Sequence, residues 1–152
     1  MSAMAYAVLT LLLAAADQLI KALVRRAPVG SALFELPGIV RVTHRSNTGA
    51  AFSLFSGKAA LLALASAALM ALVVWLFLRA MHPSRPAKLA LAALLGGGIG
   101  NLVDRVLFGS VTDYIQTLFV DFPVFNFADI CVTVSVGVLL LLLATGRLEE
   151  RG

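Results

Sequence analysis

The segment VTDYIQTLFVDFPVFNFAD, residues 111–129, separates the last two long hydrophobic runs of the chain. It holds three of the eight acidic residues, Asp113, Asp121 and Asp129. A carboxylate at a membrane boundary is energetically costly unless a partner or a function retains it there. The interpretation of this segment therefore depends on whether the runs on either side of it cross a membrane.

The composition of the chain is that of an integral membrane protein. Of its 152 residues, 61% are hydrophobic and only 13% are charged, and the mean hydropathy is +0.97. A soluble domain of this size could not bury so much apolar surface. The length suggests one domain, residues 1–152. Four runs in it are long enough to cross a bilayer, at about residues 4–24, 59–80, 87–107 and 128–144.

The connection between the first two spans, about residues 25–57, has a different character. Proline and glycine punctuate it, and short β-type runs remain at residues 32–36, 39–44 and 51–55. We expect a small twisted sheet that rests on the membrane surface. Residues 112–120 are expected to form a short interfacial helix between the third and fourth spans. The predicted fold is thus an all-α membrane protein with four transmembrane helices, a small outer β-sheet and this interfacial helix.

Four spans place both termini on one side of the membrane, but the basic residues do not decide which side. Seven Lys and Arg fall on the side of the first and third connections and five on the other. They lie at the ends of apolar runs, so we assign the net charge of +4 to contact with anionic lipid head groups and not to nucleic acid. The acidic residues are less evenly divided. Six of the eight gather on one side: Asp17, Glu35, Asp104, Asp113, Asp121 and Asp129.

Asp113 and Asp129 are the first candidate site residues. One follows the third span and the other begins the fourth, so antiparallel neighbouring helices could bring them to the same depth. Two carboxylates that share a site do not easily both ionise, and such a pair can act as acid and base. The alternative is that Asp129 only caps the fourth helix and Asp113 is a solvated loop charge. Spacing alone favours this alternative.

Two further polar pairs precede the second span. Asp17 and Lys21 have the i,i+4 spacing of an ion pair on one helix face, either at the membrane boundary or behind a site. Asn47 and Gly49 indicate a tight turn, which is either a plain hairpin connection or a means of presenting the Asn47 amide to a substrate carbonyl.

The third span is rich in glycine at residues 96–100, which indicates close helix approach. Asn101, Asp104 and Arg105 follow on one helical side. Arg105 needs a carboxylate partner, and Asp17 or Asp113 suits it better than the adjacent Asp104. Three residues before Asp129 stands Asn126, which can cap the fourth helix or hydrogen-bond a carboxylate.

The chain gives no sign of a metal or cofactor site. His44 and His82 are far apart, and no Cys/His cluster is present. Cys131 is the sole cysteine and lies in an apolar run, where it is interpreted as a packing residue.

Five ordered stretches together resemble the lipoprotein signal peptidases (signal peptidase II), the membrane aspartic peptidases of bacteria. They begin at Asp17, Asn47, Gly100, Val111 and Phe125, and read DQLIK, NTGAAFS, GNLVDR, VTDYI and FNFAD. The match is spread over most of the chain, and the four-span plan and the length agree with it.

The resemblance implies roles for the polar residues. Asp113 and Asp129 correspond to the catalytic dyad of an aspartic endopeptidase. The positions that bind substrate or order the site are Asp17, Lys21, Asn47, Gly49, Asn101, Asp104, Arg105 and Asn126. No metal or cofactor is implied.

The resemblance also implies a substrate and a location. The substrate is a prolipoprotein that carries a diacylglyceryl group on its cysteine, and cleavage just before that cysteine releases the signal peptide. The enzyme would be a multi-pass protein of the bacterial cytoplasmic (inner) membrane. Its site and sheet would lie on the extracytoplasmic side and both termini in the cytoplasm. Nothing requires more than a monomer with membrane lipids around it.

Two other functions are compatible with four spans. A small proton- or ion-coupled transporter subunit would use the same aspartates as ion sites, but it should also have polar residues near the middle of its spans, and the second span has none. A non-enzymatic membrane adaptor would need no paired acids.

Overall fold

A computed structural model describes residues 2–49, 57–80 and 82–149. It contains four long apolar helices, α1 (Ala3–Val24), α2 (Ala59–Ala80), α3 (Arg85–Phe108) and α4 (Phe127–Ala144). Each is long and apolar enough to cross a membrane. The four predicted transmembrane helices are thereby confirmed.

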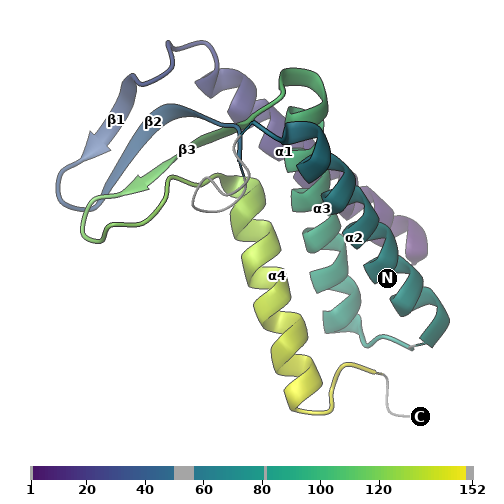
Figure 1. Ribbon diagram of the computed structural model, residues 1–152. Helices are drawn as coiled ribbons and strands as arrows, with labels where there is room; N and C mark the ends of the chain where they lie inside the picture. The colour runs from purple at the N-terminus through teal and green to yellow at the C-terminus, as the bar shows by residue number, and fades with distance from the viewer. Residues whose placement is uncertain (1, 50–56, 81, 150–152) are drawn as a thin grey trace.

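Helix α3 packs against each of the other three helices (Figure 1). Its glycines allow this close packing, as the sequence predicted. A β-carbon on Gly97 would lie 2.5 Å from the carbonyl oxygen of Ala128 in α4, and one on Gly96 would lie 2.8 Å from the β-carbon of Leu13 in α1. The large apolar side chains that remain exposed on the helices, such as Leu64 and Leu141, suit contact with lipid.

A three-stranded antiparallel sheet projects from one end of the helices, and both ends of the chain lie away from it (Figure 1). Its strands are β1 (Ala32–Leu36), β2 (Val40–Asn47) and β3 (Val111–Thr117), in the order β1-β2-β3. The predicted run at residues 51–55 lies outside the described residues.

The predicted interfacial helix at residues 112–120 is wrong, because this segment begins with β3. Its residues pair with β2, with Arg45 opposite Asp113 and Val42 opposite Ile115. Strand β2 needs a partner for its backbone groups on the side away from β1. Residues 111–117 are rich in the β-branched and aromatic types that favour a strand.

Candidate active site

Asp113 and Asp129 lie at the junction of the sheet and the helices. Asp113 belongs to β3, and Asp129 is in the first turn of α4. Both line one cavity of about 1070 Å³ that extends between α2, α3 and α4. Three of the other candidate site residues line the same cavity, namely Asn47, Asn101 and Arg105. Candidate side chains that are far apart in the sequence, from residue 47 to residue 129, thus line one cavity.

Asn126 connects the two carboxylates. Its side-chain amide donates to Oδ1 of Asp113 at 2.7 Å, and its backbone N–H donates to Oδ2 of Asp129 at 3.1 Å. Its Oδ1 accepts from the backbone N–H of Asp129 at 3.0 Å, which completes a capping box at the start of α4. Asn126 is fully buried. It therefore caps the helix and also holds a carboxylate, the two roles that its sequence position suggested.

Asp113 is not the solvated loop charge of the alternative interpretation, because it is only 3% exposed. Burial is the main cause that raises its pKa from 3.8 to about 6. The charge of Asp129 acts in the same direction. Hydrogen bonds donated by Asn47, at 2.9 Å, and Asn126 oppose this rise because they stabilise the carboxylate.

Asp129 occupies a position that suits an anion. Its Oδ1 accepts from the side-chain amide of Asn101 at 2.8 Å, and its Oδ2 faces the N-terminus of α4. The first N–H groups of α4 are satisfied from other elements. The N–H of Phe127 donates to Oη of Tyr114 at 3.1 Å, and that of Ala128 donates to Oδ1 of Asp17 at 3.1 Å. Strand β3 and helix α1 thus fix the turn that carries Asp129.

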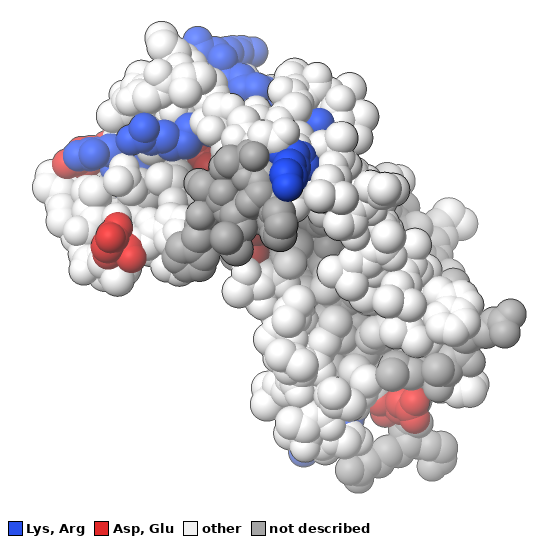
Figure 2. Space-filling view, viewed as in Figure 1, with Lys and Arg blue, Asp and Glu red and all other residues white. Residues whose placement is uncertain are grey.

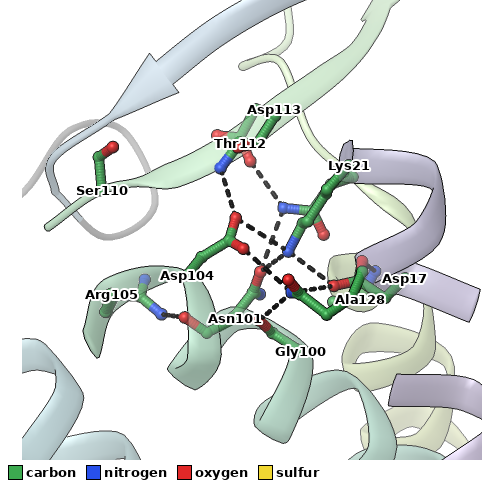
Figure 3. Close-up of polar contacts among 12 residues, drawn as sticks. Asp17, Lys21, Gly100, Asn101, Asp104, Arg105, Ser110, Thr112, Asp113 and Ala128 are labelled. Carbon is green, nitrogen blue, oxygen red and sulfur yellow. Dashed lines mark hydrogen bonds and ion pairs between the residues drawn. The ribbon is translucent and has the colours of Figure 1, made fainter. Parts of the chain in front are cut away.

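Asp17, Lys21 and Asp104 form an ionic core behind the cavity (Figure 3). Nζ of Lys21 lies 2.8 Å from Oδ2 of Asp17 and 3.5 Å from Oδ2 of Asp104, and all three side chains are fully buried. Lys21 therefore does not extend to the membrane surface. It donates to Oδ1 of Asn101 at 2.8 Å, the same amide that donates to Asp129. The ionic core thus connects to the candidate pair through Asn101.

The prediction that Arg105 pairs with the carboxylate of Asp17 or Asp113 is wrong. None of the ion pairs found among residues 2–49, 57–80 and 82–149 includes Arg105. Asp17 is already paired with Lys21, and Asn47 and Asn126 satisfy Asp113. The guanidinium of Arg105 donates instead to the carbonyl oxygens of Asn101, at 3.4 Å, and Gly49, at 3.5 Å. Its charge faces the cavity, and no carboxylate in the described part of the chain forms an ion pair with it.

Gly49 and Asn47 form the predicted turn. The N–H of Gly49 donates to Oδ1 of Asn47 at 2.9 Å, which leaves the other side of the amide free to donate to Asp113. The turn therefore orients the Asn47 amide toward the carboxylate and not toward an empty substrate position. Residues 50–53 of the same motif lie outside the described residues.

Four residues of the site were not predicted to order it. Gln18 donates to Oδ1 of Asp104 at 3.0 Å, and Arg25 donates to the same oxygen at 3.1 Å and to Oγ1 of Thr112 at 3.1 Å. Tyr114 completes the set. Arg25 lies one further turn along the face that carries Asp17 and Lys21, so helical spacing could have identified it. The contacts of Thr112 and Tyr114 depend on β3, which was predicted as a helix.

Among the described parts of the chain, no group of three His, Cys, Asp or Glu side chains is arranged as metal ligands would be. The chemistry that the arrangement can perform is that of two carboxylates with different environments, one buried in the sheet and one at a helix N-terminus. They face a cavity that also contains a cationic side chain. Such a pair can hold one proton and exchange it with a bound substrate and water.

Residues 9–145 match the sequence pattern of the family described as signal peptidase (SPase) II. The chain belongs to this family. The lipoprotein signal peptidase of Streptococcus pneumoniae is 36% identical over 147 residues, which cover 96% of this chain and 95% of that protein. That of Trichormus variabilis is 41% identical over 130 residues, with 85% of this chain and 81% of its own covered.

The fold agrees with a solved structure. A bacterial membrane enzyme determined by the in meso method at 2.3 Å resolution superposes with a TM-score of 0.86 at 27% identity, over 99% of this chain and 94% of that one. The signal peptidase II resemblance is confirmed, and the protein is a multi-pass membrane peptidase. The transporter alternative gains no support from these relatives.

Proposed function

We propose that this protein removes the signal peptide from diacylglyceryl-modified prolipoproteins and that it does so as an aspartic endopeptidase. The observation that carries the proposal is the pair Asp113 and Asp129, joined by Asn126 and facing one cavity at the sheet end of a membrane bundle. The relatives named lipoprotein signal peptidases support the substrate class.

The two carboxylates take different roles because their environments differ. Asp113 is the acid, because burial raises its pKa to about 6 and lets it hold a proton. Asp129 is the base, because the α4 N-terminus and the Asn101 amide favour its anion. Asp129 takes a proton from water as the water oxygen bonds to the peptide carbonyl carbon. Asp113 at the same time gives its proton to the carbonyl oxygen.

The second step restores the pair. When the tetrahedral intermediate collapses, the C–N bond breaks and the proton on Asp129 passes to the leaving nitrogen of the lipidated cysteine. Asp113 recovers its proton from the hydroxyl that becomes the new carboxyl group. The pair returns to one proton, and no cofactor is consumed.

The cavity suits a substrate that arrives from the bilayer. Leu69, Met70 and Val73 of α2 face Val132 and Val136 of α4 across it, and this apolar part extends from the carboxylates into the span region. An apolar signal peptide and the acyl chains of the lipid can occupy it without losing their lipid-like surroundings. The scissile bond before the cysteine then lies beside Asp113 and Asp129, where Arg105 can contact the peptide.

The remaining candidate residues hold this arrangement in place. Asn101, Asn126 and the carbonyl of Gly49 order the groups that line the cavity, while Asp17, Lys21 and Asp104 hold α1 and α3 together behind it. We place the site on the extracytoplasmic side of the bacterial inner membrane, with both termini in the cytoplasm. The protein acts as a monomer among membrane lipids.

The test uses purified protein in detergent with a lipidated prolipoprotein, and cleavage is followed by gel shift. We expect Asp113→Asn and Asp129→Asn each to reduce cleavage by about 10⁴-fold or more. The reason is that an amide can neither give a proton as the acid does nor take one as the base does. The matched control is Asp121→Asn, which changes an exposed acid of the same segment and should cleave normally. Circular dichroism and thermal unfolding check that each variant is folded. Normal cleavage by a folded Asp113→Asn or Asp129→Asn protein would refute the dyad.

A further inference from the structure

Arg45 stands at the rim of the cavity, and its side chain has no fixed partner among the described residues. It belongs to β2, directly opposite Asp113 in the β2–β3 register, and it lines the cavity beside Asn47. Its side chain is exposed. No hydrogen bond or ion pair joins it to any residue that the structure describes. Figure 2 shows basic side chains lying across the sheet end of the molecule.

Two other arginines at this end of the molecule are paired with carboxylates. Arg25 is paired with Asp104 and stacks on Phe108, and Arg41, on the same strand as Arg45, is paired with Glu35 at 2.6 Å. Arg45 therefore carries a positive charge that is not used within the described fold. A guanidinium beside a peptidase cavity is suited to bind a carboxylate of the substrate.

The path of the substrate chain through the cavity determines which substrate residue Arg45 can contact. In the proposed function the apolar part of the cavity among the spans holds the signal peptide, so the chain that follows the scissile bond leaves past the sheet. Directly opposite residues of antiparallel strands have β-carbons about 5 Å apart. An extended peptide advances about 3.3 Å per residue. The guanidinium of Arg45 can therefore reach about the second or third residue after the bond that Asp113 and Asp129 cut.

We propose that Arg45 is a specificity residue, which binds an acidic side chain shortly after the lipidated cysteine of the prolipoprotein. The inference rests on the proposed function. The pair Asp113 and Asp129 keeps one negative charge in the same cavity, which would repel such a side chain, so a cation at the rim is needed to accept it. Arg105 lies deeper, where it donates to the carbonyls of Asn101 and Gly49, and does not replace Arg45 at the rim.

The experiment compares three lipidated prolipoproteins that differ only in the second residue after the cysteine, which is Asp, Asn or Lys. For the unmodified enzyme we expect kcat/KM to be highest for Asp and lowest for Lys, with about two- to fivefold between Asp and Asn. Added salt should reduce the difference, because the contact is at an exposed rim. Arg45→Gln should abolish the preference, and Arg45→Glu should reverse it in favour of Lys.

The matched control is Arg41→Gln, which removes a charge from the same strand at a position that does not line the cavity. It should keep the preference for Asp. Equal cleavage of the three substrates by the unmodified enzyme, or a preference that persists in Arg45→Gln, would overturn the inference while leaving the proposed function intact. If no lipidated substrate is cleaved at all, the proposed function fails, and the role of Arg45 fails with it.

Discussion

Asp113 determines how the activity should depend on pH. Its pKa is raised to about 6, chiefly by burial, and the hydrogen bond from Asn47 acts against this rise. An acid must be protonated to act, so we predict that kcat/KM falls as the pH rises above about 6. Asn47→Ala removes a donor that stabilises the carboxylate, so the pKa of Asp113 should rise and the alkaline limb should move to higher pH. A pH–rate profile of each protein measures this, and a limb that stays or moves to lower pH would contradict the assignment of Asp113 as the acid.

Lys21 is the residue on which the stability of the buried ionic core depends. It is fully buried and lies between the carboxylates of Asp17 and Asp104. Lys21→Met keeps the length of the side chain, but it leaves the buried Asp17 without a cation and Asp104 with Arg25 alone. We predict a loss of about 3–5 kcal/mol in the free energy of unfolding. Thermal unfolding in detergent, followed by circular dichroism, should show this as a large decrease in Tm.

The control for the buried ion pairs of Lys21 is an ion pair at the surface. Arg41 and Glu35 are paired on the sheet surface, where solvent screens them. Arg41→Met should cost less than about 1 kcal/mol. Equal effects of the two substitutions would show that the ionic core contributes no more to stability than a surface pair.

At the scale of helices, the separation of α3 and α4 is set by Gly97. A β-carbon there would lie 2.5 Å from the carbonyl oxygen of Ala128, the residue before Asp129. Gly97→Ala should therefore displace the first turn of α4, and we predict about a hundredfold lower kcat. Gly137→Ala is the control, because a β-carbon at Gly137 in α4 meets nothing within 4 Å. It should leave cleavage unchanged and can raise helix stability by up to about 1 kcal/mol. If Gly97→Ala has normal kcat, the spacing of these helices does not control the site.

The elements that the sequence could predict are those with a local cause. A span needs a continuous apolar run, so hydropathy located all four helices, and the i,i+4 spacing of Asp17 and Lys21 indicated their ion pair. Strand β3 has a local signal in its β-branched and aromatic residues, but its pairing with β2 joins residues about seventy positions apart in the chain and could not be found in this way. The partners of Arg105 depend on the same long-range packing. Of the two contacts that Asn126 makes, the cap on α4 could be predicted because it joins residues close in the chain. Its hydrogen bond to Asp113 could not be predicted, because it depends on the packing of β3 against α4.

In the whole molecule the candidate site gathers at one end of an apolar body. The sheet, the candidate pair and the ionic core lie at the end away from both termini (Figure 1). Charge counting does not orient this arrangement in the membrane, but the proposed function does, because it places cleavage of the precursor on the outer side. Sidedness is therefore a property on which the proposal can be tested in living cells, independently of any cleavage assay.

The test uses the sole cysteine of the chain. Cys131→Ala gives a cysteine-free protein, which we expect to be active because that thiol packs against α3 and has no chemical role here. Single cysteines are then introduced at Asp121, on the segment after β3, and at Glu149, near the C-terminus, both of which are exposed. A membrane-impermeant maleimide should label Asp121→Cys on intact bacterial spheroplasts and Glu149→Cys only after the membrane is permeabilised. The opposite pattern would place the candidate pair in the cytoplasm, where a precursor that has already crossed the membrane could not reach it.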